Sequence, residues 1–178
     1  GSIAGGVQAR AGIRRAGETR SGTYFDWKPI GNSAWAGFGE GGNTLVVASK
    51  GELVLVDTKF AAFASGLRRE AETLVSDSKH TLKLVINTHH HGDHTGGNLG
   101  FSKDVPILSQ EKAKPRVESQ IDRYKQQVKG GVTQLAKSDK PEANAILEEA
   151  TKLADALDEI KASQFTPTKT FGFEHEAK

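Results

Sequence analysis

Residues 44–87 carry the alternation of strands and helix that is typical of a parallel sheet. Two continuous apolar runs, residues 44–48 and 53–56, are joined by a polar tetrapeptide, which predicts a hairpin between buried strands. From residue 60 to residue 75 apolar side chains recur at three- and four-residue spacing, as on one face of an amphipathic helix. Residues 82–87 are predicted to form another short strand. Strand, helix and strand predict a βαβ unit, and α/β folds place their sites at the carboxyl ends of such strands.

The regions on either side of this unit differ from it in composition. Residues 1–22 are rich in Gly, Ala and Arg with few large apolar side chains, so we expect a flexible N-terminal arm. Residues 23–178 are expected to belong to one domain. Within it, two apolar stripes of helical period predict an antiparallel helix pair in an insertion over about residues 111–163, either a packing seam or a lid over a cleft. Asp139 with Glu142 resembles a capping box that begins the second helix.

Charge and composition exclude several classes of protein. The 24 basic and 22 acidic residues give a formal net charge of +2 and are scattered along the chain, so we expect no nucleic-acid partner. No apolar stretch is long enough to span a bilayer, so we expect no membrane partner. Cysteine is absent, which excludes disulfides and thiolate metal ligands. A cysteine-free chain that opens on glycine fits a processed periplasmic or secreted protein, and the cytoplasm stays an open alternative.

A histidine cluster begins two residues after the predicted strand 82–87. An extended segment points alternate side chains to opposite sides, so His89 and His91 are predicted to bind one metal ion while His90 points away. The glycine that follows lets the backbone turn and brings Asp93 and His94 toward a second metal position. Zn²⁺ accepts imidazole and carboxylate ligands, and two metal ions roughly 3.5 to 4 Å apart can hold a bridging hydroxide that attacks an electrophilic carbon or phosphorus. The cluster therefore predicts a two-metal hydrolytic site.

The segment 88–98, T-H-H-H-G-D-H-T-G-G-N, resembles the His-X-His-X-Asp-His signature of the metallo-β-lactamase superfamily. The region before it is similar to that family as well, with a glycine-rich hairpin, a strand that ends in Asp57, a helix, and the strand that leads to the signature. The resemblance covers residues 30–110 and implies an αββα sandwich, of which this chain is the N-terminal half.

The same resemblance implies the site and its chemistry. It assigns His89 and His91 to a first zinc ion, and Asp93 and His94 to a second, with Asp93 also the catalytic residue. It implies hydrolysis of a small-molecule ester, thioester, lactone or amide, β-lactams included, by a metal-bridging hydroxide. A catalytic zinc ion takes three protein ligands and a water, so each metal lacks a ligand in this motif. His175 does not resemble the family's third histidine, so we expect a C-terminal half or a second chain to complete the fold.

Other polar residues near the motif have structural interpretations. Asp57 is expected to hold the metal loop by hydrogen bonds, and Thr95 and Asn98 to brace it. A non-catalytic alternative also stays open: the fold can serve as a metal-binding or interaction module whose incomplete ligand set supports no turnover.

Overall fold

The computed structural model describes residues 22–75 and 80–173. The arm predicted over residues 1–22 lies outside the described residues except for Gly22, and so does His175. No helix in the described ranges is long and apolar enough to cross a membrane.

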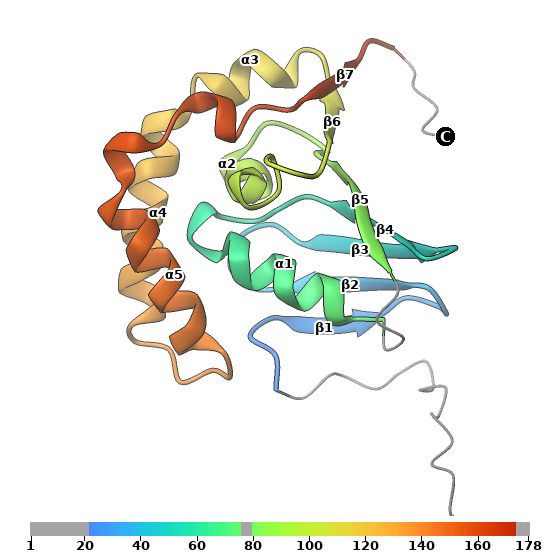
Figure 1. Cartoon of the computed structure of the whole chain (residues 1–178), viewed down its shortest axis with the longest axis horizontal. Helices are drawn as coiled ribbons and strands as arrows, with labels where there is room; N and C mark the ends of the chain where they lie inside the picture. The colour runs from blue at the N-terminus through green and yellow to red at the C-terminus, as the bar shows by residue number, and fades with distance from the viewer. Residues whose placement is uncertain (1–21, 76–79, 174–178) are drawn as a thin grey trace, which may run out of the picture.

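The described strands form a seven-stranded sheet in sequence order from β1 to β7 (Figure 1). Neighbouring strands from β1 to β4 pair antiparallel, and those from β4 to β7 pair parallel. The strands are β1 (Asp26–Pro29), β2 (Ala34–Phe38), β3 (Thr44–Ser49), β4 (Glu52–Val56), β5 (Thr81–Ile86), β6 (Ile107–Gln110) and β7 (Lys169–Phe171). The predicted hairpin is β3–β4, and the predicted βαβ unit is β4, α1 (Ala64–Thr73) and β5. Both predictions are confirmed.

The helices lie on one side and at one end of the sheet (Figure 1). Those with α geometry are α1, α2 (Gly92–Thr95), α3 (Ala113–Glu118), α4 (Ile121–Leu135) and α5 (Ala143–Asp155). Short 3₁₀ helices are η1 (Ala61–Phe63), η2 (Gly96–Gly100), η3 (Leu157–Glu159) and η4 (Ala162–Gln164). Helices α4 and α5 contact each other and run in opposite directions, which confirms the predicted antiparallel pair.

The capping box predicted for the second helix is wrong. Helix α5 begins at Ala143, and the residue before it, Glu142, has a left-handed backbone with a φ of 63° and caps nothing with its side chain. Left-handed backbone cannot belong to the first turn of a helix, so Asp139 lies outside α5.

One face of the sheet is buried against α1. Apolar side chains of β3, β4 and β5 form a single cluster with Leu67 and Ala71 of α1. The alternate residues of these strands are apolar too but only partly buried: Leu45, Val47, Val54, Val56, Leu84 and Ile86. Because successive side chains point to opposite faces of a strand, the second face of the sheet is apolar and incompletely covered.

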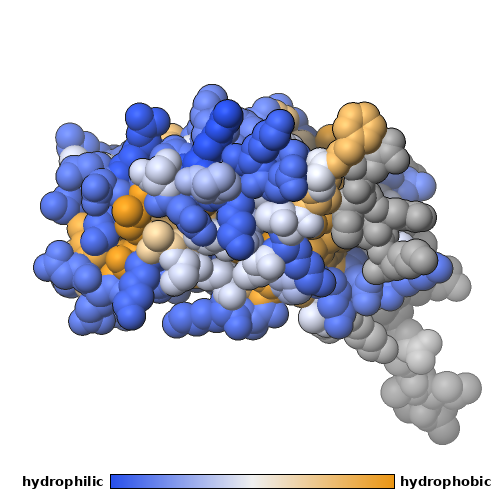
Figure 2. All heavy atoms as spheres, turned by 90° about the horizontal axis from the view of Figure 1, so that it is seen from above, coloured by the Kyte–Doolittle hydropathy of each residue, from blue (hydrophilic) through white to orange (hydrophobic). Residues whose placement is uncertain are grey.

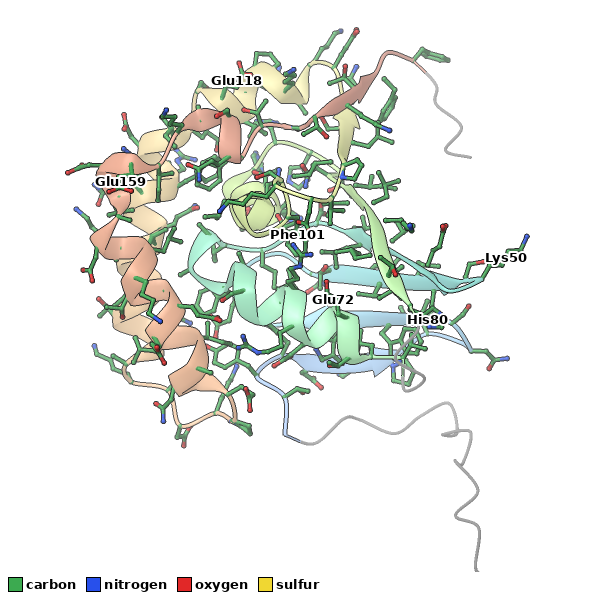
Figure 3. All side chains as sticks on the ribbon, in the orientation of Figure 1. Lys50, Glu72, His80, Phe101, Glu118 and Glu159 are labelled. Atoms are coloured by element: carbon green, nitrogen blue, oxygen red, sulfur yellow. The ribbon has the colours of Figure 1, made fainter. Side chains whose placement is uncertain are left out.

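The β3–β4 hairpin and the helix pair mark opposite ends of the molecule. Figure 3 shows Lys50 at the tip of the hairpin and Glu159 after α5 at the far side. Strands β4 and β5 start near the hairpin tip and run toward the helices, so their carboxyl ends and the loops that follow face the helical side.

Candidate metal centre

The candidate centre lies at the carboxyl ends of two adjacent parallel strands. Asp57 directly follows β4, and His89 comes three residues after the end of β5, in which Ile86 pairs with Val56. The chain then turns into α2, which carries Asp93 and His94. The sheet therefore brings together side chains from two segments, as the βαβ pattern predicts.

Asp57, His89 and His94 form the closest group of possible metal ligands among the described residues. One ligand atom from each lies within 4.8 Å of the other two. His94 Nδ1 is 2.8 Å from Asp57 Oδ2, and the rings of His89 and His94 have centroids 4.2 Å apart. The Asp57 side chain is 5% exposed and that of His94 is 22% exposed, so the group is recessed but reachable from solvent.

The other predicted ligands lie beside this group. Asp93 Oδ2 is 3.4 Å from His94 Nε2, and the exposed His91 ring has its centroid 4.6 Å from that of His89. The His90 ring is farther from His89, at 6.3 Å. His91 and Asp93 are thus adjacent to the close group without belonging to it, and the assignment of His89, His91, Asp93 and His94 as ligands stays a prediction.

Asp57 makes the hydrogen bonds that the sequence predicts for it. The Thr88 backbone N–H donates to its Oδ1 at 2.8 Å, and the Thr88 hydroxyl donates to its Oδ2 at 2.7 Å. The same Oδ2 faces His94 Nδ1. The sequence predicted for Asp57 only the role of holding the metal loop by hydrogen bonds. It did not indicate that the Asp57 carboxylate also belongs to the group of possible ligands with His89 and His94.

Thr95 and Asn98 brace the loop as predicted. The fully buried Asn98 exchanges two hydrogen bonds with Asn87, at 2.8 and 3.1 Å, and accepts another from Thr58 at 2.9 Å. The Thr95 hydroxyl donates to the His91 carbonyl at 2.9 Å. Buried amide and hydroxyl groups with satisfied partners hold a segment in one arrangement.

Helix α4 packs directly on the metal motif. Just before it, Gln120 Nε2 donates to the His90 carbonyl at 2.7 Å. One turn later the hydroxyl of the buried Tyr124 lies 2.7 Å from that of Thr95. One turn further, the Gln127 amide covers Gly92 of the motif. A Cβ added at Gly92 would lie 2.7 Å from Gln127 Nε2. The sequence interpretation left this helix as part of a packing seam or a lid over a cleft and missed its contacts with the motif, for which a polar residue at each helical turn was the available signal.

A buried lysine fixes the loop between β2 and β3. Lys59 is fully buried, and its ammonium donates to the backbone carbonyl of Gly37 in β2 at 3.1 Å and to those of Gly39 and Gly42 in the loop at 2.7 and 2.8 Å. Burial disfavours the charged amine and lowers the pKa of Lys59 to about 8. The sequence gives no local signal for this contact.

The anchored loop in turn touches the motif. The Gly42 N–H donates to the Asp93 carbonyl at 3.0 Å. A Cβ at Gly42 would lie 2.3 Å from the His94 ring, so only glycine lets the loop pack against this imidazole.

The electrostatics of the centre favour a neutral His89. Burial, followed by the neighbouring His94 and His91, lowers the pKa of His89. Neutral imidazole is the form that binds metal ions, and with carboxylate oxygen it makes a donor set suited to a divalent metal of borderline softness.

A family comparison supports a metal site in this chain. A family model described as the metallo-beta-lactamase superfamily matches residues 37–170. Three similar solved structures are metallo-β-lactamases. The enzyme from Hirschia baltica is 20% identical over 51% of this chain and 45% of its own, with a TM-score of 0.45, and FIM-1 from Pseudomonas aeruginosa in its mono-zinc form is 18% identical over 51% of this chain and 44% of its own, with a TM-score of 0.44. The subclass B3 enzyme BJP-1 of Bradyrhizobium japonicum is 26% identical over 48% of this chain and 33% of its own, with a TM-score of 0.42. The aligned part thus spans less than half of each of these chains. No curated protein matches the sequence.

Proposed function

The chain belongs to the metallo-β-lactamase superfamily, and from that premise we propose that it carries the N-terminal part of a zinc-dependent hydrolase. The observation that carries the proposal is the convergence of Asp57, His89 and His94 at the carboxyl ends of β4 and β5, with ligand atoms within 4.8 Å of one another. A second sheet-end feature supports it: the carboxylate of Asp93 lies next to the same group.

In the proposed centre, His89 and His91 hold one zinc ion, and Asp93 and His94 hold the other. The neutral state favoured for His89 and the position of Asp93 beside His94 Nε2 fit these assignments. Zinc bound there would supply a water-derived nucleophile at neutral pH and stabilise the anion formed in hydrolysis.

The chain's own residues orient these ligands. The Asp57 carboxylate lies 2.8 Å from His94 Nδ1 and can only accept there, so it favours the tautomer that keeps Nε2, 3.4 Å from Asp93 Oδ2, for zinc. The Asp93 side chain is 38% exposed, so it can also accept a hydrogen bond from the attacking water and align it with the scissile bond. We propose an ester, thioester, lactone or amide as substrate, with β-lactams among the amides.

We further propose that polypeptide from a C-terminal half or a second chain completes the centre. A catalytic zinc ion takes three protein ligands, and each proposed ion has two here. The partly exposed apolar face of β3, β4 and β5 supports the proposal, because a second sheet packed on it would bury those side chains.

The test uses the full-length protein and a panel of the four substrate classes. We expect two zinc ions per molecule, hydrolysis that a chelator abolishes, and recovery when zinc is restored. Asp93→Ala should remove one zinc ion and the activity while the protein stays folded. Asp155→Ala, an exposed carboxylate at the end of α5, is the matched control and should change neither. Hydrolysis that survives chelation would refute the proposal, and tight zinc binding without turnover on any substrate would favour the inert metal-binding module.

A further inference from the structure

A polar pocket of about 350 Å³ opens beside the candidate metal centre. It is lined by His90 and His91 of the motif and, from α3, α4 and the turn between them, by Arg116, Ser119, Gln120 and Arg123. His91 is shared with the metal centre, because its ring packs against that of His89. A molecule in this pocket would therefore contact one of the predicted metal ligands.

The charge of the pocket is one-sided. Arg116 and Arg123 contribute two guanidinium groups, and none of the six lining residues is acidic. Both arginines are exposed, and in the described part of the chain the ion pairs of arginine are made by Arg68 and Arg69 instead. Guanidinium groups without a carboxylate partner bind anions such as carboxylate and phosphate, often through two parallel hydrogen bonds.

The backbone that carries these arginines is held in place. The Arg116 carbonyl accepts hydrogen bonds from Ser119 Oγ and Gln120 Nε2, both at 2.9 Å. The same Gln120 amide donates to the His90 carbonyl, which ties the turn between α3 and α4 to the metal motif. Two positively charged side chains thus lie beside the centre, on a turn whose backbone is hydrogen-bonded at Arg116, and the outer face on the side of α3 is mostly hydrophilic (Figure 2). A fixed backbone lowers the entropy lost when a ligand binds.

We propose that this pocket binds an anionic group of the substrate, a carboxylate or a phosphate, and holds it beside the metal centre. The statement that the bound anion belongs to a substrate rests on the proposed hydrolytic function, whereas the anion site itself rests on the pocket alone. It deepens the function by naming a substrate class: small molecules with an oxyanion on one side of the hydrolysed bond.

The first experiment measures anion binding without metal or turnover. Benzoate, phenyl phosphate and the neutral control benzamide are titrated into the metal-free full-length protein, with binding followed by NMR of the arginine Nε–H groups. We expect the two anions to bind and benzamide not to bind. The double substitution Arg116→Gln and Arg123→Gln should lower the affinity for both anions about tenfold, the loss expected for charge-assisted hydrogen bonds. The control Lys129→Gln removes an exposed charge from α4 outside the pocket and should leave the affinity unchanged.

The second experiment separates the anion site from the hydrolytic function. With zinc-loaded protein and a pair of esters that differ by one carboxylate, the double variant should raise KM for the anionic ester and leave KM for the neutral ester and the zinc content unchanged. Equal affinity of the wild type and the double variant for both anions would overturn the anion site. Arginine-dependent anion binding in a protein that hydrolyses nothing would overturn the hydrolase and keep the anion site.

Discussion

Replacement of Asp57 by asparagine is predicted to weaken zinc binding and to lower the free energy of unfolding by a comparable amount. The Thr88 backbone N–H donates to Oδ1 of Asp57 at 2.8 Å, and a backbone N–H can only donate. In Asp57→Asn the amide oxygen is therefore pinned at this position, and the NH₂ group occupies the position of Oδ2. The NH₂ group then donates to His94 Nδ1, so the proton of the imidazole moves to Nε2, the nitrogen that we assign to zinc.

The structure gives a magnitude for each effect. Bonds to a charged acceptor contribute about 1.5–3 kcal/mol and bonds between neutral groups about 0.5–1.5 kcal/mol, so loss of the charge on this 5% exposed carboxylate should lower the free energy of unfolding by about 2 kcal/mol. To bind zinc, the variant must move the proton back and break the new bond, which lowers the zinc affinity about 10- to 100-fold.

The assay compares wild type with Asp57→Asn in three measurements: urea denaturation of the metal-free protein, zinc affinity by competition with a chromophoric chelator, and the His94 tautomer by ¹⁵N NMR. Asp104→Asn is the matched control, because Asp104 is 56% exposed and pairs only with Arg68 among the described residues. This surface pair contributes about 0–1 kcal/mol, and the control should bind zinc normally. An Asp57→Asn protein that retains the wild-type zinc affinity would refute the tautomer argument.

Three further predictions concern the surroundings of the centre. Gly42→Ala should displace the His94 ring and lower zinc affinity about tenfold, as expected for groups that orient a ligand. In the control Gly130→Ala an added Cβ meets nothing within 4 Å, so zinc affinity should not change. Equal zinc affinities of the two variants would contradict the prediction. Glu70→Gln should lower the free energy of unfolding by about 3 kcal/mol in urea denaturation, because the buried carboxylate accepts two backbone N–H groups and one indole N–H from the region of β1. Lys59 has a pKa of about 8 in the folded protein against 10.5 for a free lysine side chain, so between these values the unfolded chain binds more protons, and the Lys59 contribution to stability rises with pH. Stability measured from pH 7 to 10.5 should therefore rise more steeply for wild type than for Lys59→Met, and parallel curves would contradict the shift.

The parts of the fold that depend on local periodicity were predictable from the sequence. Apolar runs and helical spacing predicted the β3–β4 hairpin, the βαβ unit and the α4–α5 pair, because strands and helices express their period within a few residues. The position of the histidine cluster after β5 followed from the same unit. The start of α5 was missed, because it depends on the left-handed backbone of Glu142, which no residue pattern indicated.

The parts of the site that depend on distant contacts were not predictable. Gln120 and Tyr124 reach the motif across 30 and 29 residues of chain, and Lys59 reaches the β2–β3 loop across about twenty. Such contacts depend on where whole elements pack, and the polar residue at each turn of α4 does not indicate which element it will contact. For this reason α4 was predicted only as part of a packing seam or a lid, although it also lies against the metal motif and bears Arg123 at the pocket.

The contacts around the motif share one property that explains how an imidazole cluster stays available for metal. Neighbouring elements bind the motif through its backbone carbonyls. The donors are Gln120 to the carbonyl of His90, Gly42 to that of Asp93 and Thr58 to that of His94, and within the motif Thr95 donates to the carbonyl of His91. Since the main chain is held from the β2–β3 loop, from the end of β4 and from α4, the side chains need few contacts of their own to keep their positions. Side-chain hydrogen bonds at both ring nitrogens would use the lone pairs that a metal ion needs, whereas His89 and His94 each have one such partner, Thr88 and Asp57, at Nδ1.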